Sequence, residues 1–239
     1  MATRIDIDKV LKLVNERGMY KGMARVAATN FEFADCMALV EAIGKQRNPN
    51  FTIDAENRFA YENFVRWLHV DKSMQALSPD DRQVIAGDPN KGIYIAGNTG
   101  SGKSWCMEVM SIYANIFGFQ IRFGNRESTI RWTTARAEEI VASYLATTSI
   151  DEFKKCDILC IQDFGAEPLE AVAMGNRQNV LRTLLEHRGD YCDRCLTLIS
   201  SNYSLRNPAL VESYGERVVS RLRQMCNYFE IKGRDRRRT

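Results

Sequence analysis

The sequence predicts a three-layer α/β/α sandwich, in which helices cover both faces of a parallel β-sheet. Two observations support this fold class. From Lys91 onward, short apolar runs of strand length alternate with segments of helical periodicity, a pattern typical of parallel strands joined by crossover helices. The chain has 239 residues, of which 45% are hydrophobic and 26% charged, so it is long enough for one sizeable core and a small appendage.

Five segments have the length and composition of buried strands, and together they predict a five-stranded parallel sheet. The expected strands are 92–96, 120–123, 157–162, 196–200 and 228–231. The periodicity predicts helices over 103–117, 135–145, 176–187 and 215–225. At least three connections are long enough to cross over the sheet, which makes the strands that they join parallel.

The first 90 residues are expected to form short helices and a linker rather than strands. Phe33, Met37 and Val40 recur at helical spacing. After a polar break, Asp54 can cap a second helix, in which Tyr61, Phe64, Val65 and Leu68 share one face. Residues 71–90 are polar and are punctuated by two prolines, so they are predicted to be a connection. The expected divisions are a helical region over 1–50, a docking helix and linker over 51–90, the core over 91–231 and a basic tail over 232–239.

Charge is nearly balanced over the whole chain but is concentrated at its end. The formal net charge is +3, which does not by itself indicate nucleic-acid binding. The last eight residues combine Asp235 with five basic side chains: Lys232, Arg234, Arg236, Arg237 and Arg238. This tail is interpreted either as a solvated end or as a segment that contacts phosphates.

Composition also bears on the compartment. No segment approaches the roughly 18 uninterrupted apolar residues of a membrane span, and the first residues lack the apolar stretch of a secretion signal. Seven cysteines, an odd number, are typical of reduced thiols. We therefore expect a cytoplasmic protein that does not contact a membrane. Cys192 and Cys195 form a single C-x-x-C pair without a second pair at ligand spacing, which disfavours a zinc site.

The strongest motif follows the first expected strand of the core. It matches G-x-x-x-x-G-K-S in full over Gly97, Asn98, Thr99, Gly100, Ser101, Gly102, Lys103 and Ser104. Glycines in such a loop allow successive backbone N–H groups to point at phosphate oxygens, and the following helix adds its positive N-terminus. The lysine would neutralise the β- and γ-phosphates and the serine hydroxyl would bind Mg²⁺, so ATP and Mg²⁺ are the expected cofactors. The alternative is a glycine-rich turn without a ligand.

An acidic residue follows a buried apolar strand further along the chain. Asp163 ends the segment 157–163 and could bind Mg²⁺ or orient a water molecule for hydrolysis, with Glu167 assisting. The alternative for Asp163 is a turn-forming role before Gly165.

Four segments together resemble the AAA+ ATPases of the DnaC/DnaI/IstB type, which are bacterial and phage helicase loaders and ATPase helpers of transposition. They are residues 97–104, 158–168, 197–202 and 215–222, and the resemblance extends over about residues 55–231. The resemblance implies a P-loop NTPase of AAA+ type. Because the chain ends soon after its fifth expected strand, we expect no C-terminal helical lid, and the arginine usual on that lid has no obvious counterpart.

The resemblance also assigns roles to three further residues. Asn202 is similar to the sensor residue that positions the attacking water, whereas a strand-end cap is the alternative role. Arg221, with Arg217 one helical turn earlier, is similar to the arginine finger that reaches into a neighbouring subunit's site. The alternative for both arginines is a helix face that is solvated or paired with Glu216.

One residue departs from the family pattern. The corresponding strand of the family ends in two acids, whereas Gln162 here precedes Asp163. Glutamine carries no charge, so hydrolysis could be slow, or Asp163 could act alone. The sequence leaves open whether ATP is hydrolysed.

The resemblance predicts a helicase-loader-like factor of DNA replication. It implies a replicative helicase as protein partner, contacts with single-stranded DNA and an ATP-dependent homo-oligomer. The alternatives are a transposition helper that binds duplex DNA and a transposase, and a non-hydrolysing nucleotide switch. A small-molecule kinase would need a lidded substrate pocket, for which the sequence gives no support.

Overall fold

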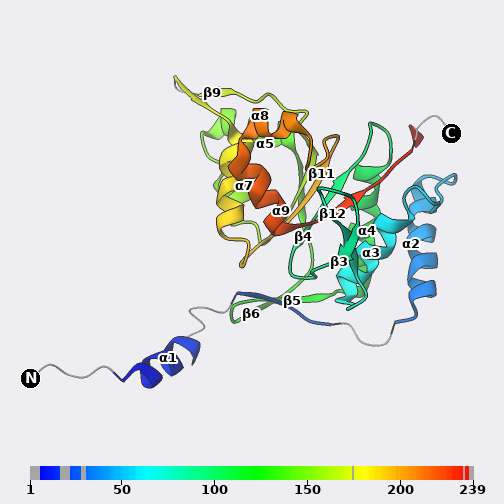
Figure 1. The fold of residues 1–239 in the computed structure, drawn as a ribbon, viewed down its shortest axis with the longest axis horizontal. Coiled ribbons are helices and arrows are strands. Elements are labelled where there is room, and N and C mark those ends of the chain that lie inside the picture. The colour runs from blue at the N-terminus through cyan, green and yellow to red at the C-terminus, as the bar shows by residue number, and fades with distance from the viewer. Residues whose placement is uncertain (1–5, 17–21, 28–30, 174, 234, 237–239) are drawn as a thin grey trace, which may run out of the picture.

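Within the described residues the main sheet contains seven strands, of which five adjacent ones, counted inward from one edge, are parallel (Figure 1). The computed structural model describes residues 6–16, 22–27, 31–173, 175–233 and 235–236. The strand order is β3-β2-β12-β4-β11-β8-β7. These strands are β2 (Gln75–Leu77), β3 (Val84–Ala86), β4 (Gly92–Ala96), β7 (Thr133–Arg136), β8 (Ile158–Phe164), β11 (Leu196–Ser201) and β12 (Cys226–Glu230). The five-stranded parallel sheet predicted from the sequence is thereby confirmed.

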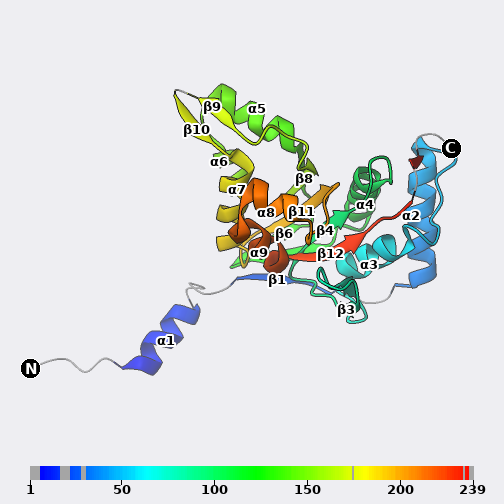
Figure 2. The same cartoon turned by 45° about the horizontal axis from the view of Figure 1, so that its top comes forward.

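Helices cover both faces of this sheet. They are α2 (Phe33–Arg47), α3 (Arg58–His69), α4 (Lys103–Phe117), α5 (Ala137–Thr147), α6 (Asp151–Lys155), α7 (Val180–Asp190), α8 (Pro208–Tyr214) and α9 (Glu216–Met225). Figure 2 shows α2, α3 and α4 on one side of the sheet and α7 and α9 on the other. Successive residues of β4 divide between the two cores: Ile93 and Ile95 pack with α3 and α4, whereas Tyr94 packs with α7 and α9. The strand is buried throughout because both of its faces are covered.

The second parallel strand lies elsewhere than expected. Residues 120–123 form β5 (Gln120–Phe123), but β5 belongs to a separate antiparallel sheet with β1 (Met23–Arg25) and β6 (Arg126–Thr129). The place beside β8 is taken by β7, whose last two residues were expected to begin a helix. Only Ala135 of β7 is buried, so this edge strand has almost no hydrophobic pattern to reveal it.

Strands also occur where the sequence predicted none. The strand β1 lies within the region expected to be purely helical, and the expected linker contains β2 and β3, which extend the main sheet in antiparallel orientation. All three are three residues long, too short for a clear alternating pattern.

The helix expected over 176–187 begins later, at Val180. Residues 176–178 instead form β10 (Asn176–Gln178), which pairs with β9 (Ala171–Ala173) in an antiparallel hairpin. The side chain of Asn179 accepts a hydrogen bond from the backbone N–H of Arg182, so Asn179 caps the helix. The cap ends the hairpin and begins α7.

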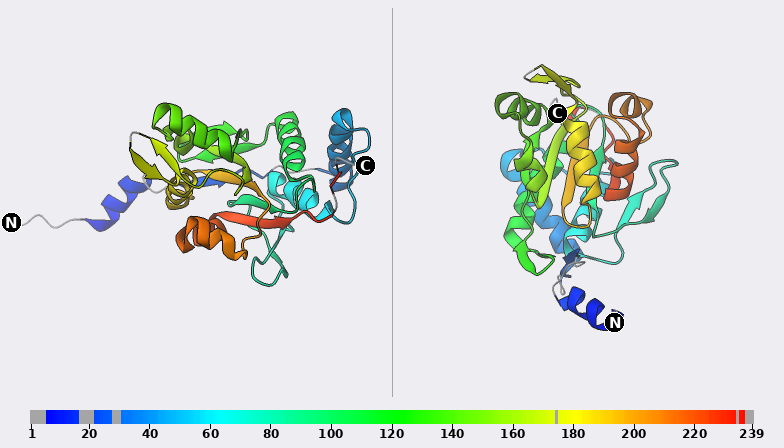
Figure 3. Two further views of the ribbon diagram at one scale, coloured as in Figure 1. Left: turned by 90° about the horizontal axis from the view of Figure 1, so that it is seen from above. Right: turned by 90° about the vertical axis from the view of Figure 1, so that its left-hand side faces the viewer.

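The first helix, α1 (Ile7–Glu16), lies apart from the body of the protein (Figure 3). Its apolar side chains Ile7, Val10, Leu11 and Leu13 are exposed. In contrast, α2 contributes Val40 and Ile43 to the same core as α3 and α4. No helix within the described ranges is long and apolar enough to cross a membrane.

The core beneath α3 contains an uncharged histidine that makes stability depend on pH. His69 is 2% exposed, and its Nε2 lies 2.8 Å from the hydroxyl of Tyr113. Burial lowers the pKa of His69 from 6.5 to about 4. Between these values the unfolded chain binds the proton and the folded chain does not. The contribution of neutral His69 to the free energy of unfolding is therefore fully present above pH 6.5 and is lost as the pH falls towards 4.

We expect the free energy of unfolding to fall by about 2 kcal/mol between pH 7 and pH 5 on account of His69. Urea unfolding of the wild type and of His69→Gln at both pH values measures this difference, which the variant should lack. His187→Gln is the matched comparison: burial also lowers the pKa of His187, the other histidine, but His187 is only half-buried, so most of the pH slope should remain in this variant. An unchanged pH slope in His69→Gln would contradict the assignment.

Candidate nucleotide-binding site

The glycine-rich loop joins the buried strand β4 to the N-terminus of the 15-residue helix α4, as the motif requires. Gly100 and Gly102 have φ angles of +76° and +100°, a region that side chains disfavour. At Gly97, an added Cβ would lie 2.2 Å from the carbonyl oxygen of Ile231. The glycines therefore permit both the curvature of the loop and its close approach to the chain after β12.

Lys103 connects the loop to the neighbouring strand. Its Nζ donates hydrogen bonds to the carbonyl oxygen of Asn98 at 2.9 Å and to Oδ1 of Asn202 at 2.8 Å. Asn202 directly follows β11, which runs parallel to β4, so both strands end at the same edge of the sheet. The amide of Asn202 consequently faces the phosphate loop, rather than only capping its own strand.

Asp163 reaches the same edge from β8. Its φ angle is +57°, in the left-handed region, which costs a non-glycine residue on the order of 1 kcal/mol or more. Its backbone N–H donates to Oγ of Ser200 at 3.2 Å, which holds this conformation. Asp163 lines the same cavity as Lys103 and Asn202.

The two polar neighbours of Asp163 lie outside this cavity. Gln162 is 7% exposed and stands opposite Arg136 in the register of β8 and β7. Glu167, expected to assist Asp163, is buried, and its carboxylate accepts hydrogen bonds from the backbone N–H of Gly165 and the hydroxyl of Tyr214. It stabilises the turn after β8 and does not reach the cavity, so this expectation is wrong. One oxygen of the carboxylate thus binds the turn and the other binds α8.

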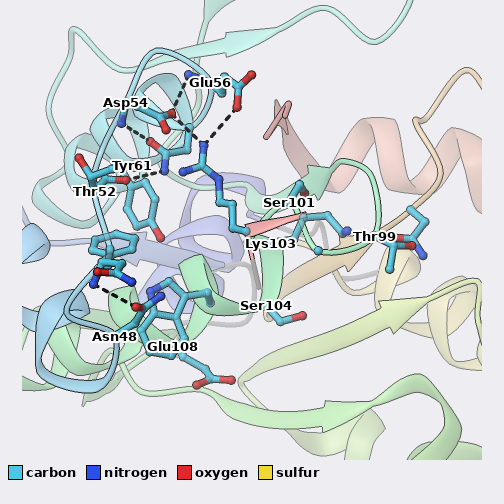
Figure 4. Close-up of a pocket in the computed structure, with 18 of the residues that line it drawn as sticks. Asn48, Thr52, Asp54, Glu56, Tyr61, Thr99, Ser101, Lys103, Ser104 and Glu108 are labelled. Carbon is cyan, nitrogen blue, oxygen red and sulfur yellow. Dashed lines mark hydrogen bonds and ion pairs between the residues drawn. The ribbon is translucent and has the colours of Figure 1, made fainter. Parts of the chain in front are cut away.

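The cavity has a volume of about 930 Å³, within the range of roughly 300–1,000 Å³ that is usual for small-molecule sites (Figure 4). One wall is the phosphate loop with the start of α4, and the other is the segment between α2 and α3. Its lining includes Thr99, Gly100, Ser101, Gly102, Lys103, Ser104, Asp163 and Asn202 from the motifs, with Asn48, Phe51, Thr52, Asp54, Tyr61, Trp105 and Arg236 from elsewhere.

Two buried polar atoms of the lining favour a bound polar group. The Oγ of Ser101 and the Nε1 of Trp105 have no hydrogen-bond partner among the described residues. Buried polar atoms without partners are costly, and a ligand with several acceptors would satisfy them. The hydroxyl of Ser104 and the carboxylate of Asp163 are oxygen ligands of the kind Mg²⁺ prefers. The residues therefore fit a nucleotide with its metal.

The segment between α2 and α3 was not predicted as part of the site. Phe51 and Tyr61 supply aromatic surface, and Asp54 and Glu56 supply charge. The sequence motifs gave no signal for this wall, because it is brought to the phosphate loop by the packing of α2 and α3 on α4.

The two arginines assigned to a trans contact lie outside the cavity, on α9. The Nη2 of Arg217 lies 3.1 Å from Oδ2 of Asp190, and Arg221 pairs with the other oxygen of the same carboxylate. Their observed ion-pair partner is Asp190 at the end of α7, not the Glu216 considered from the sequence. In one chain the structure does not bring either arginine to Lys103.

Part of the basic tail does reach the cavity. Arg236 lines it and lies 2.8 Å from the carboxylate of Asp54. Arg234, Arg237 and Arg238 lie outside the described residues.

Comparison with known proteins gives a likeness of fold. No protein-family model and no curated protein matches the sequence. The crystal structure of the DnaC helicase loader superposes with a TM-score of 0.52 and 18% identity, covering 77% of this chain and 95% of that one. DnaA from Aquifex aeolicus, solved with AMPPCP, has a TM-score of 0.46 and 19% identity, covering 77% of this chain and 48% of that one. Over about three quarters of its length, the chain therefore has the fold of the DnaC helicase loader.

Proposed function

We propose that this protein binds ATP with Mg²⁺ in the cavity beside the glycine-rich loop and hydrolyses it slowly. The observation that carries the proposal is the convergence of Lys103, Asp163 and Asn202, from three neighbouring strand ends, on one cavity of suitable size.

Each of these residues has a role that its position supports. Lys103 neutralises phosphate charge, and the loop N–H groups bind phosphate oxygens. Ser104 and Asp163 would hold Mg²⁺, which would supply further positive charge next to the phosphates. Asp163 orients the attacking water, and the amide of Asn202 hydrogen-bonds to that water or to the terminal phosphate. Gln162 is buried outside the cavity. Among the described residues at the strand ends, Asp163 is therefore the carboxylate that lines the cavity.

Lys103→Ala is expected to weaken ATP binding by about 30-fold or more, because it removes the charge that compensates the phosphates in a partly desolvated site. Binding of a fluorescent ATP analogue and single-turnover hydrolysis, with and without single-stranded DNA, measure the effect. Lys45→Ala on α2 is the matched control, since Lys45 pairs with Glu41 on an exposed surface. Equal binding by the wild type and Lys103→Ala would contradict the proposed site.

We further infer that the protein acts in DNA replication as a helicase-loader-like factor that forms an ATP-dependent oligomer. A solved structure of similar fold is that of a helicase loader. A replicative helicase is the proposed partner, and the exposed apolar side chains of α1 are suited to pack against it. Single-stranded DNA is the proposed nucleic acid. Affinities for single-stranded and duplex DNA at matched salt test this, because a preference for duplex would favour a transposition helper with a transposase as partner.

A second candidate is a nucleotide switch that binds ATP without hydrolysing it. The burial of Gln162 away from the cavity favours it, because this chain lacks the usual second acid beside Asp163. Tight binding without any single turnover, in the presence of DNA, would support the switch. Turnover that Lys103→Ala abolishes would support the ATPase.

A further inference from the structure

The chain that follows β12 turns back across the phosphate loop. The backbone N–H of Ile231 donates to the carbonyl oxygen of Ala96 at 2.8 Å, and that of Lys232 donates to the carbonyl oxygen of Glu56 at 3.1 Å. The N–H of Arg236 then donates to the carbonyl oxygen of Gly100 at 2.9 Å. We call the described residues of this segment, 231–233 and 235–236, the C-terminal clasp. It contacts the end of β4, the segment before α3 and the phosphate loop.

The side chain of Arg236 joins the clasp to the opposite wall of the cavity. Its Nη2 donates to Oδ1 of Asp54 at 2.8 Å and to Oε2 of Glu56 at 3.4 Å (Figure 4). The side chain is 23% exposed, so this pairing is partly shielded from water. The hydrogen bond lowers the pKa of Asp54 and raises that of Arg236. The two walls are thus connected by a charged contact.

Two glycines allow the clasp to lie this close. A Cβ at Gly100 would lie 2.1 Å from Oδ1 of Asp235, and one at Gly233 would lie 1.9 Å from Oε2 of Glu56. Both glycines have positive φ angles. The backbone of each glycine is therefore in contact with a carboxylate, that of Asp235 or that of Glu56, and a larger residue at either position would push this carboxylate aside.

The clasp borders the cavity without filling it. With Arg236 in its lining, the cavity still has a volume of about 930 Å³. This leaves space for a nucleotide between the two walls that Arg236 connects. A nucleotide in this space would lie beside Arg236 of the clasp.

We propose that the C-terminal clasp closes the nucleotide site and that Arg236, paired with Asp54, is a positioning residue that slows nucleotide release. This inference rests on the proposed function, since it requires nucleotide in the cavity. Nucleotide would pass the clasp both on entry and on release, and the structure has the pair between Arg236 and Asp54 formed. Loss of the pair should therefore raise the dissociation rate and should not lower the association rate.

The test is stopped-flow measurement of both rate constants for a fluorescent ATP analogue with the full chain. We expect Arg236→Ala and Asp54→Asn each to raise the dissociation rate about tenfold, with an association rate equal to or above that of the wild type. Arg236→Lys keeps the charge but not the forked geometry and should give an intermediate rate. Asp54→Arg combined with Arg236→Asp should restore slow release.

Arg223→Ala is the matched control, because Arg223 pairs with Asp80 on the surface and does not line the cavity. Its dissociation rate should equal that of the wild type. An unchanged dissociation rate in Arg236→Ala would overturn the clasp while leaving the nucleotide site intact. Tighter nucleotide binding in Arg236→Ala would also overturn it. That result would show that the intact clasp, whose Asp235 carboxylate lies against Gly100, competes with phosphate in the wild type. A wild-type protein that binds no nucleotide would overturn both proposals.

Discussion

Arg221→Ala is expected to lower the ATPase rate of the assembled protein about 1,000-fold while leaving ATP binding by single subunits unchanged, because an arginine supplied in trans stabilises charge on the terminal phosphate by that order. Its side chain lies against Gly189, where an added Cβ would come within 2.8 Å of it, and its guanidinium pairs with Asp190. Arg217 shares the same carboxylate, so two positive charges face one negative charge at this surface.

A mixing experiment separates a trans contact from a local defect. Lys103→Ala should lack a working phosphate loop but retain Arg221, whereas Arg221→Ala should lack the arginine but retain the loop. Each variant alone should be inactive, and the mixture should recover activity, because Arg221 from one subunit completes the site of the other. Arg223→Ala, on the same helix, is the control and should keep wild-type activity. Full activity of Arg221→Ala alone, or an inactive mixture of variants that still assemble, would contradict the assignment.

Arg188→Met is expected to lower the free energy of unfolding by about 4 kcal/mol. Arg188 is fully buried in α7, and its guanidinium donates to Oγ1 of Thr197 and to the carbonyl oxygens of Phe153, Cys156 and Leu196. Methionine has a similar length but no donor, so it would leave these buried acceptors without partners. Burial lowers the pKa of Arg188, and its four described acceptors compensate for the lost water.

Urea unfolding at pH 7 measures this loss. Arg182→Ala is the matched control on the same helix: Arg182 pairs with Glu186 at the surface, and its loss should change the stability by about 0.5 kcal/mol or less. Arg188→Lys, which keeps a charge but fewer donors, should be intermediate. A loss below about 1 kcal/mol in Arg188→Met would show that water replaces the guanidinium.

The parts of the site that the sequence predicted are those that depend on local geometry. The phosphate loop needs only a strand, glycines and a helix in succession, so the motif alone located Lys103 and Ser104. Asp163 was predicted from its place at the end of a buried strand, whereas Asn202 was predicted from the family resemblance. Both lie at one edge of the sheet because their strands are parallel. The five parallel strands were predicted in number, but the one beside β8 was assigned to residues 120–123, because those are more apolar than β7.

The sequence by itself therefore determined the fold class and the phosphate-binding end of the cavity, since both are recorded in short-range patterns of glycine and apolar residues. Only the tertiary structure decided the rest: the wall between α2 and α3, the buried partners of Arg188 and the pairing of Asp190 with two arginines. The clasp is the extreme case, because Arg236 and Asp54 are 182 residues apart in the chain. Single polar contacts over such separations have no periodicity, and they form only when packing of the apolar core has brought their helices and strands together.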